Sequence, residues 1–571
     1  MWKFLSIVFQ ILLTLSDGFD VGLTQTRRRY SSVLAVRAHR NAFHQQYLHD
    51  TNENEGVYVA TCIPGLSSVL ADELQAIGAP LVEKTGNAAV RFTADTETAL
   101  RALIWCRTPH KIMELLCESP PTVQTRDDLY HFVRETVPVK DLVGDGKGGL
   151  LTLSVSTLLN NPSRLPKDIN HSHYTALTVK NAICDEVRDL RGDRPDVSTE
   201  NPDLPLVAVV RGMSSGRAGG GESNVPPSAQ FSLFRQIHHG SLHRRGYRST
   251  IHKAAMKESL AAGLLLNAEW HKQCAKHKEQ HEEPLVLIDP MAGSGTLLLE
   301  GMFIAGDVAP HVLRLKCGLE PALAHQFPPI TRWKHGKMSV GQLWKDLLLE
   351  ASQKAKNGLR YLKGVNNNKR PMYFVANDFH GGALDLLDES METAGVGDLV
   401  NVQEAGCREF VPRLPQDISS TPWTVVCNPP WGVRLTEEIE ESWESLRVFL
   451  RETCPEGTMA HVLSGNAKAT KHLGLRRSAS LPIQVGTVQM RWIQYLMQKP
   501  EKQKDFAFAN VSSQQHSKES PPLSVSRNSR QPPESSYRRP IPVSLPKPKP
   551  KKKQKVAAAV PSDETNEWLI D

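Results

Sequence analysis

The sequence predicts an α/β protein whose second half holds a mostly parallel sheet. Residues 285–300 contain an apolar run ending in Asp289, then a glycine turn, then an apolar helical stretch. A second apolar run, residues 423–427, ends in the tetrapeptide Asn428-Pro-Pro-Trp431. Buried runs of this kind, set between helical stretches, favour parallel strands whose functional turns lie at one edge. We therefore expect a Rossmann-like domain over residues 251–500.

The part of the chain before this domain predicts two smaller α/β units. Residues 51–120 alternate as βα–ββα, which indicates a ferredoxin-like unit, and residues 121–250 contain further α/β alternation. The expected strands are 57–62, 88–92, 150–155 and 206–210, and the expected helices are 66–77, 96–105, 127–136 and 174–188.

Composition limits the kinds of site that the folded body can hold. The nine cysteines include no Cys-x-x-Cys pair, so we expect neither a zinc site nor a disulfide framework. The net charge of +7 is concentrated in the ends: residues 1–50 carry six Lys/Arg against three acids, and residues 501–571 carry thirteen against eight. The middle is close to neutral, so net charge does not indicate nucleic-acid binding by the folded body.

The first 50 residues have the composition of a targeting presequence. Lys3 precedes an apolar stretch, residues 4–15, which is too short to span a bilayer but suits a signal-peptide core. An Arg/Ser-rich, acid-free stretch follows Asp20, as in transit peptides. The combination resembles the bipartite plastid presequence of algae with secondary plastids. We expect a plastid location, with the mitochondrion or secretory pathway as alternatives, and no stable membrane association after processing.

Two segments are expected to be disordered. The tail, residues 501–571, is rich in Ser, Pro, Gln and Lys and includes the basic run 547–555. That run suits sequence-independent contact with RNA phosphates, and a merely solvated tail is the alternative. Residues near 212–230 are rich in Gly and Ser and indicate a flexible insertion.

The tetrapeptide after the second apolar run suits recognition of a planar amine. The side-chain oxygen of Asn428 and the carbonyl of Pro429 can accept its two N–H bonds, and Trp431 can stack on the attached ring. Pro430 completes this candidate catalytic loop. Together with the glycine turn, the motif predicts a methyltransferase that uses S-adenosylmethionine and methylates an amino group.

The glycine turn itself excludes two other nucleotide-binding classes. Asp289-x-x-x-Gly293-x-Gly295 lets the backbone approach a ligand closely and frees amides at the next helix. No Gly-Lys-[Ser/Thr] follows, so the turn is not a P-loop. No acid follows a strand about twenty residues on, so it is not the dehydrogenase fingerprint.

Five collinear blocks resemble the bacterial large-subunit rRNA guanine-N2 methyltransferases, specifically the N-terminal enzyme of the fused bacterial protein. They span nearly the whole folded body. The blocks are Tyr58–Leu74, Asn170–Ile183, Leu242–Ala262, Asp289–Glu300 and Asn428–Leu435. The resemblance implies a ferredoxin-like unit (51–120), a THUMP RNA-binding domain (121–250) and a class I methyltransferase domain (251–500).

The resemblance also assigns residues to cofactor and RNA. It implies that the glycine turn holds the amino-acid part of S-adenosylmethionine, that Asp289 supports its ammonium, and that Asp378 binds the ribose hydroxyls. THUMP domains bind RNA, and a tight Arg-rich turn suits phosphate or base contacts. The candidate cofactor-binding residues of the glycine turn are Asp289, Pro290, Gly293, Ser294, Gly295 and Thr296. The candidate RNA-binding residues are His171, Tyr174, Lys180, Arg244, Arg245 and Arg248.

One departure from the family concerns the adenine of the cofactor. Members usually have an Asp at the end of the third strand, where this chain has Gly406, with Glu404 two residues before it. Adenine recognition is thus left open. The expected function is N2-methylation of a guanine in large-subunit rRNA; a tRNA guanine, or a non-catalytic role in ribosome assembly, are the alternatives. Oligomeric state is not predicted.

Overall fold

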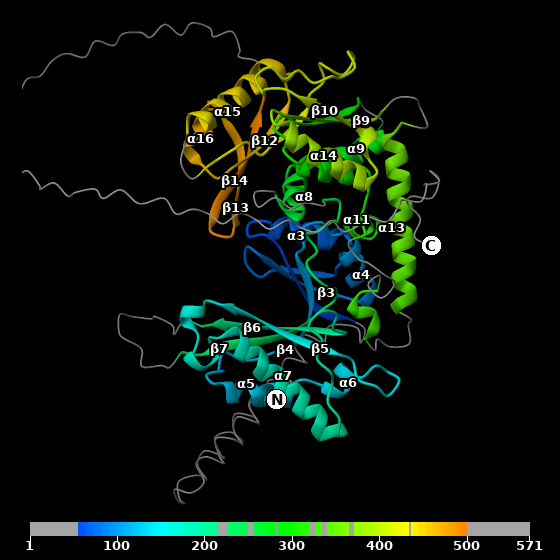
Figure 1. Cartoon of the computed structure of the whole chain (residues 1–571), viewed down its shortest axis with the longest axis vertical. Helices are drawn as coiled ribbons and strands as arrows, with labels where there is room; N and C mark the ends of the chain where they lie inside the picture. Colours follow the sequence, from blue (N-terminus) through cyan, green and yellow to red (C-terminus); the bar gives the residue numbers. More distant parts are fainter. Residues whose placement is uncertain are drawn as a thin grey trace, which may run out of the picture. The chain divides into compact units, whose positions relative to one another are not determined.

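The N-terminal part of the protein is organised by one seven-stranded sheet in the computed structural model (Figure 1). Its first six elements follow the βαββαβ order of a ferredoxin-like unit. They are β1 (Gly56–Thr61), α3 (Ser67–Ala76), β2 (Leu81–Lys84), β3 (Ala89–Ala94), α4 (Thr96–Trp105) and β4 (Lys111–Glu118). The ferredoxin-like unit expected from the sequence is confirmed, with β2 and β4 added to the predicted strands.

The structure describes residues 55–213, 227–248, 256–280, 283–318, 327–333, 340–364, 370–432 and 436–498. All of them belong to one compact unit. The predicted presequence and the predicted basic tail lie outside the described residues, as does most of the predicted insertion near 212–230.

The second α/β unit extends the same sheet. Strand β4 pairs antiparallel with β7, so the strand order runs β2-β3-β1-β4-β7-β6-β5. Helix α7 packs against α5 and β5 on this half. The elements are α5 (Arg126–Thr136), α6 (Val139–Val143), β5 (Leu153–Asn160), α7 (Ser172–Arg191), β6 (Leu204–Gly212) and β7 (Ala229–Gln236). The two units predicted separately from the sequence therefore share one sheet.

The C-terminal half contains a second seven-stranded sheet, ordered β10-β9-β8-β11-β12-β14-β13. The first five strands run parallel, and β14 and β13 are antiparallel to their neighbours, which confirms the mostly parallel sheet expected. The strands are β8 (Leu285–Asp289), β9 (Met372–Asp378), β10 (Val400–Glu404), β11 (Thr424–Cys427), β12 (Met459–Ser464), β13 (Arg477–Val485) and β14 (Val488–Leu496).

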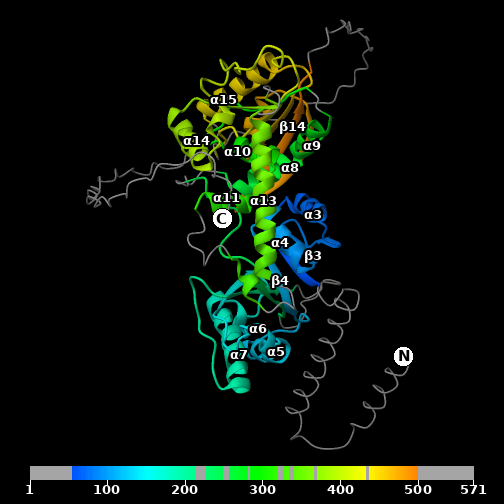
Figure 2. The ribbon, with the colours of Figure 1, turned by 90° about the vertical axis from the view of Figure 1, so that its right-hand side faces the viewer.

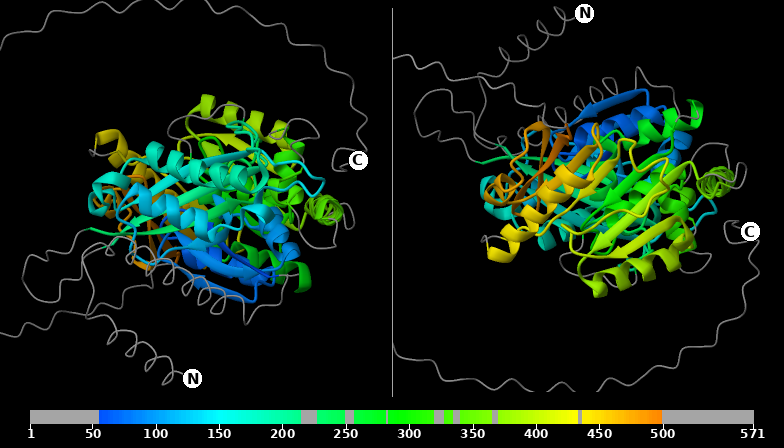
Figure 3. Two further views of the ribbon diagram at one scale, coloured as in Figure 1. Left: turned by 90° about the horizontal axis from the view of Figure 1, so that it is seen from below. Right: turned by 90° about the horizontal axis from the view of Figure 1, so that it is seen from above.

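Helices cover both faces of this sheet (Figure 3). Buried residues of one group of helices join a core with the N-terminal sheet, whereas those of the other group form a separate core. The first group is α8 (Glu258–Asn267), α9 (Trp270–Gln280), α10 (Thr296–Ala305) and α14 (Gly381–Ala394), and the second is α15 (Glu437–Val448) and α16 (Ala467–Lys471). The sheet is thus the middle layer of a three-layer α/β domain.

A long insertion between β8 and β9 ties the two sheets together. It includes α11 (Pro310–Lys316), a short 3₁₀ turn η3 (Pro329–Arg332) and the helix α13 (Val340–Leu362), which packs along α4 (Figure 2). The indole N–H of Trp333 donates to the carbonyl of Asp203 at 3.0 Å, and the guanidinium of Arg235 lies 4.1 Å from the Trp333 ring. The insertion therefore braces the C-terminal half against β6 and β7.

The hairpin β13–β14 makes a second contact between the halves. The backbone N–H of Gln484 donates to the carbonyl of Pro64 at 3.0 Å. Gly65, next in the chain, has φ +105°, and a Cβ there would collide with the carbonyl of Pro482. Only glycine allows this close approach.

The residues that the structure describes include neither a single membrane-spanning helix nor a metal-binding cluster. No single helix there combines the length and apolar composition of a membrane span; α10 and α11 reach them only as a pair bent by 111°. Within the same residues, no group of three or more His, Cys, Asp or Glu side chains is arranged to hold a metal ion.

Candidate active site

Four polar residues follow the carboxyl ends of neighbouring strands in the C-terminal sheet. Asp289 ends β8, Asp378 ends β9, Glu404 ends β10, and Asn428 follows the last residue of β11. Because these strands are parallel and adjacent, the four residues lie along one edge. The structure thus brings together the two motifs that the sequence analysis paired.

The glycine turn after β8 is fixed by two carboxylates. The backbone N–H of Met291 donates to Oδ1 of Asp289 at 3.2 Å, and that of Gly293 donates to Oδ2 of Asp378 at 2.8 Å. Asp378 also accepts the backbone N–H of His380 at 2.9 Å. The turn of β8 and the end of β9 are therefore one hydrogen-bonded assembly.

The two glycines of the turn serve different purposes. Both have left-handed backbones, with φ +55° at Gly293 and +70° at Gly295. A Cβ on Gly295 would collide with the Leu387 side chain of α14, so this glycine permits helix packing. A Cβ on Gly293 would meet no atom within 4 Å. The open space beside Gly293 is suited to a ligand.

The other turn residues complete the entry into α10. Pro290 is buried, and its carbonyl accepts the side-chain N–H of Asn377 at 3.0 Å. Ser294 is half-buried within the turn, and Thr296 is buried as the first residue of α10. The cap residue of this ten-residue helix is Gly295, which supplies no side-chain cap to its first amides, and such amides favour anionic groups.

The carboxyl group of Asp289 is buried with no cationic partner among the residues that the structure describes. Burial raises its pKa well above the usual value near 4, and the neighbouring Asp378 raises it further. A cation placed against Asp289 would reverse this shift. The site therefore fits a ligand that brings a positive charge to Asp289 and a neutral or hydroxyl-bearing part to Asp378.

Asn377 holds the turns of three strands together, a role that the sequence analysis did not assign. Its side-chain N–H groups donate to the carbonyls of Pro290 and Ala405, both at 3.0 Å, and its backbone carbonyl accepts the backbone N–H of Ala292 at 2.7 Å. It is fully buried. The only signal in the sequence was its place directly before Asp378 at a strand end.

The end of β10 presents two acids near the position where the family has one. The Glu404 carboxylate lies over Gly381, 3.2 Å from where a Cβ would stand. The Glu409 carboxylate occupies the space that a side chain on Gly406 would fill. The ring of Phe379, next to Asp378, is 72% exposed. Phe379 and Glu409 were both missed from the sequence, and they offer a flat surface and an acceptor.

The Asn-Pro-Pro-Trp loop is fixed from several sides. The indole N–H of Trp431 donates to Oδ1 of Asn428 at 3.1 Å, and the ring lies against Gly465, where a Cβ would come within 2.5 Å. The indole N–H of Trp443 donates to the carbonyl of Pro430 at 2.8 Å. Asn428 is half-buried and Pro429 is buried. One acceptor position of Asn428 is thus taken by Trp431, which the sequence analysis did not anticipate.

Comparisons with protein families agree with this architecture. Residues 58–113 match the RlmL ferredoxin-like domain, residues 164–214 match the THUMP domain, and residues 245–494 match the RMKL-like methyltransferase domain. The chain combines these three domains. This confirms the resemblance and the fold class expected from the motifs, and the cofactor of the methyltransferase domain is S-adenosylmethionine.

Curated relatives carry the name ribosomal RNA large subunit methyltransferase K/L. The protein of Pseudomonas savastanoi pv. phaseolicola is 32% identical over 419 residues, which cover 73% of this chain and 48% of the relative. That of Pseudomonas fluorescens is 31% identical over 420 residues, covering 73% and 47%. The chain therefore spans about half the length of the curated relatives it matches.

Solved structures share the fold. A possible methylase from Clostridium difficile 630 has a TM-score of 0.59 at 18% identity, covering 78% of this chain and all of that one. SMU.472, a putative methyltransferase complexed with SAH, has a TM-score of 0.57 at 17% identity, covering 79% of this chain and all of that one.

Three of the candidate RNA-binding residues, His171, Tyr174 and Lys180, lie on α7 or at its N-terminus, within the region that matches the THUMP domain. His171 and Tyr174 are exposed at its N-terminus, with ring centroids 4.7 Å apart, and Tyr174 is 52% exposed. Lys180 lies two turns further along and is half-buried. The structure leaves the two rings available for contact with a ligand.

The three arginines of the Arg-rich turn differ in their exposure to solvent. Arg244 is exposed. Arg245 is 1% exposed and lies 3.6 Å from the buried carboxylate of Glu300, while Arg248 binds Glu258 at 2.6 Å. The expectation of RNA contacts does not fit Arg245 and Arg248, because both guanidinium groups neutralise buried acids.

Proposed function

We propose that this chain transfers a methyl group from S-adenosylmethionine to the 2-amino group of a guanine in large-subunit rRNA. The observation that carries the proposal is the shared edge at which the glycine turn, Asp378 and Asn428 meet. The names of the curated relatives support the rRNA substrate.

Each part of the cofactor has a matching group along this edge. The ammonium of the methionine part would pair with Asp289, and the open space at Gly293 would take its backbone. The ribose hydroxyls would donate to Asp378. The adenine would stack on Phe379 and donate its amino group to Glu409, which stands in the place of the acid missing at position 406.

The acceptor amine would bind at the next turn along the edge. A carbonyl oxygen has two lone pairs, so Oδ1 of Asn428 can accept an amine N–H while it also accepts Trp431. The Pro429 carbonyl would accept the other N–H. Both bonds orient the nitrogen lone pair toward the methyl group, and alignment of the two reactants is the main requirement of this transfer. The base must leave its stack to enter the loop.

Two other functions remain to be separated from this one. A tRNA guanine would use the same chemistry, and the relatives' names favour rRNA. A non-catalytic role in ribosome assembly is disfavoured by the geometry, because Asp289, Gly293, Asp378 and Asn428 all occupy positions that suit cofactor and acceptor.

The experiment is transfer of labelled methyl groups to total RNA that lacks the modification. The labelled RNA is then separated by size, and its nucleosides are identified by mass spectrometry. Label in N2-methylguanosine of large-subunit rRNA supports the proposal. Label in tRNA would instead identify tRNA as the substrate. Cofactor binding without transfer to any RNA favours the assembly role.

We also propose plastid delivery by residues 1–50, which rests on their composition alone. A fluorescent protein fused behind these residues should accumulate in plastids of an alga with secondary plastids. Accumulation in mitochondria, or secretion, would show that residues 1–50 direct the protein to that destination and not to the plastid.

A further inference from the structure

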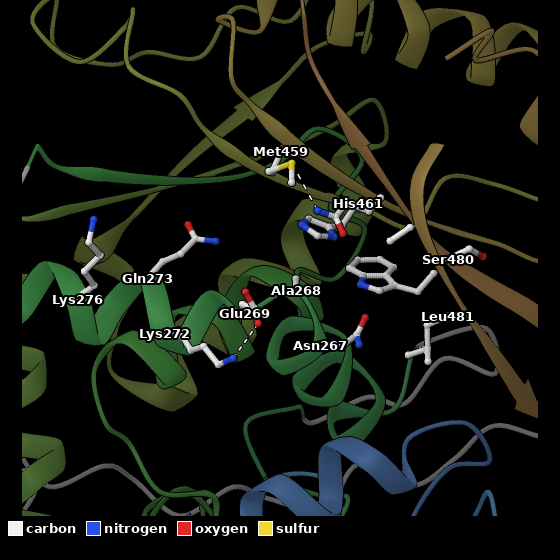
Figure 4. Close-up of a pocket in the computed structure, with 13 residues that line it drawn as sticks. Asn267, Ala268, Glu269, Lys272, Gln273, Lys276, Met459, His461, Ser480 and Leu481 are labelled. Atoms are coloured by element: carbon white, nitrogen blue, oxygen red, sulfur yellow. Dashed lines mark hydrogen bonds and ion pairs between the residues drawn. The ribbon is translucent and has the colours of Figure 1, made fainter. Parts of the chain in front are cut away.

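Strand β12 is a fixed support beside the strand that leads to Asn428. It pairs with β11 on one side and with β14 on the other, and the pairing with β14 extends from Met459 to Ser464, its whole length. In its first half, Met459 and His461 line a cavity of about 550 Å³ together with α9 (Figure 4). Because β11 and β12 are parallel neighbours, the residues that follow β12 lie at the edge of the sheet where Asn428 follows β11.

Gly465, the first residue after β12, lies against the ring of Trp431. A Cβ at this position would stand 2.5 Å from Cε3 and Cζ3 of the ring. Gly465 is not one of the glycines with a positive φ, so its backbone conformation is open to other residues. The Trp431 ring therefore requires the missing side chain, and the turn itself does not.

The same ring is fixed from a second direction. Its indole N–H donates to Oδ1 of Asn428 at 3.1 Å. The contact with Gly465 and this hydrogen bond together set the position of the ring relative to Asn428. The ring is half-buried, so part of its surface is open, and a base that stacks there would be placed relative to Asn428 as well.

Asn466 holds the end of the Asn-Pro-Pro-Trp loop. Its side-chain N–H donates to the carbonyl of Gly432 at 3.1 Å. Its Oδ1 accepts the backbone N–H groups of Lys468 and Ala469 at 2.9 and 3.3 Å, which caps α16. An aspartate would cap α16 equally well, but it could not donate to Gly432. Capping therefore does not account for the amide of Asn466.

Two hydroxyl groups keep Asn466 in this position. The backbone N–H of Asn466 donates to Oγ of the buried Ser464 at 3.2 Å. The hydroxyl of Thr470 lies 2.8 Å from the same Oγ and 2.9 Å from the backbone carbonyl of Asn466. The donor that reaches Gly432 is thus in place before a substrate binds.

We propose that the end of β12 positions the acceptor loop for methyl transfer, through Gly465 and Asn466. Gly465 sets the place of the Trp431 ring, and Asn466 holds the loop through Gly432. The inference rests on the proposed function, since it assigns both residues to the same reaction. Both are positioning residues that act through the loop, and a small displacement of aligned groups lowers the rate of transfer without loss of the cofactor.

The first test is a double-mutant cycle on methyl transfer to unmodified total RNA by the full chain. Gly465→Ala displaces the Trp431 ring and should lower kcat/KM about tenfold, as the loss of base stacking does. In a Trp431→Ala background the added methyl group meets no ring, so the same change should cost less than about twofold. Gly397→Ala is the control and should keep full activity, because a Cβ on Gly397 would meet no atom within 4 Å.

The second test separates the two roles of Asn466. Asn466→Asp keeps the cap of α16 and loses the N–H that reaches Gly432, so kcat/KM should fall about fivefold while the unfolding temperature stays at the wild-type value. Asn466→Ala loses both contacts, and should show the same fall in kcat/KM together with a lower unfolding temperature. The affinity for S-adenosylhomocysteine should be that of the wild type in every variant.

The outcomes separate this inference from the proposed function. Equal losses from Gly465→Ala in the two backgrounds would overturn the role of Gly465, and full activity of Asn466→Asp would overturn that of Asn466. Weakened S-adenosylhomocysteine binding would also count against action through the loop. Should Gly465→Ala not fold, the Asn466 pair decides whether the end of β12 positions the loop. Absence of transfer to any RNA by the wild type would instead overturn the proposed function, and this inference with it.

Discussion

The indole N–H of Trp431 donates a hydrogen bond of 3.1 Å to the side-chain oxygen of Asn428. The aromatic residue of the loop thus holds the residue proposed to accept the substrate amine. It fixes the Asn428 side chain before any RNA is bound, at the cost of one of its two acceptor positions. Preorganised acceptors of this kind need no rearrangement when the reactants meet.

This relationship predicts different outcomes for two changes at Trp431. Trp431→Phe keeps a ring that can stack on the base and loses only the N–H, so kcat/KM should change by less than about fivefold, since a neutral hydrogen bond contributes about 1 kcal/mol. Trp431→Ala also removes stacking worth about 1–3 kcal/mol, and should lose 10-fold or more. Steady-state methyl transfer measures both. Equal losses in the two variants would contradict a stacking role.

The placement of Glu409 over Gly406 predicts which residue reads the cofactor adenine. Glu409→Gln weakens a charge-assisted hydrogen bond worth about 1.5–3 kcal/mol, so the preference for S-adenosylhomocysteine over its inosine analogue should fall about tenfold. Glu404→Gln is the matched control and should keep the preference. Calorimetry with both ligands decides. Loss of preference in the control alone would assign the role to Glu404.

The two glycines of the turn predict separable defects. Gly295→Ala places a methyl group against Leu387 in a left-handed backbone, and should cost about 2–4 kcal/mol of folding free energy. Gly293→Ala pays only the backbone penalty of about 1–2 kcal/mol, but fills the space kept for the cofactor. Denaturant unfolding and S-adenosylhomocysteine binding distinguish them. Normal cofactor affinity in folded Gly293→Ala would show that the ligand lies elsewhere.

Arg244 and Arg245 are adjacent but should behave in opposite ways. Arg245→Ala removes the guanidinium 3.6 Å from the buried carboxylate of Glu300, which keeps the hydrogen bond from the Tyr247 hydroxyl, and should destabilise the fold by about 3 kcal/mol. Arg244→Ala should change stability by less than about 0.5 kcal/mol while weakening RNA binding in a salt-dependent way. Thermal unfolding and RNA anisotropy test the pair. A stable Arg245→Ala variant with weakened RNA binding would restore the RNA role to Arg245.

The buried His238, two residues after β7, predicts sensitivity to acid. Burial lowers the pKa of His238 to about 3, and its ring nitrogen accepts the backbone N–H of Ile112 at 3.0 Å. The unfolded chain takes up a proton on this residue below about pH 6.5, whereas the folded chain does not, so stability falls as the pH falls from 6.5 toward 3.

His238→Gln removes that proton uptake and keeps an acceptor for Ile112. The slope of unfolding free energy against pH, between pH 6 and 4, should fall by up to about 1.4 kcal/mol per pH unit. Denaturant titrations across this range provide the measurement. An unchanged slope would show that His238 is protonated in the folded protein.

Local sequence signals located the helices α3, α4, α5 and α7 and the strands β1, β3, β6, β8 and β11. Helix α4 was predicted at its observed bounds, Thr96–Trp105, and the structure shows that the Asp95 side chain caps its first turn. Strands β4 and β7 were missed, and so was the sheet they join. Their pairing links residues more than a hundred positions apart, and no periodicity within a short window reports such a contact.

For the candidate site, too, the residues within short motifs were predicted, whereas the contacts between distant residues were missed. Asp289, Gly293, Asp378 and Asn428 were found because each sits in a short motif at a strand end. The burial of Arg245 was missed, although Glu300 gave a signal: a single acid within an apolar helix requires a buried partner. Glu409 could not be found from the sequence, since its position over Gly406 depends on the path of the turn.

The central claim is that Asn428 positions a guanine amine for methylation. The most direct measurement is transfer of labelled methyl groups to unmodified total RNA by the wild type and by Asn428→Ala, with S-adenosylhomocysteine affinity measured for both. The account predicts N2-methylguanosine in large-subunit rRNA with the wild type, and a loss of about 100-fold or more in the variant, with cofactor affinity retained. Equal transfer by the two proteins, or label in a different nucleoside, would contradict it.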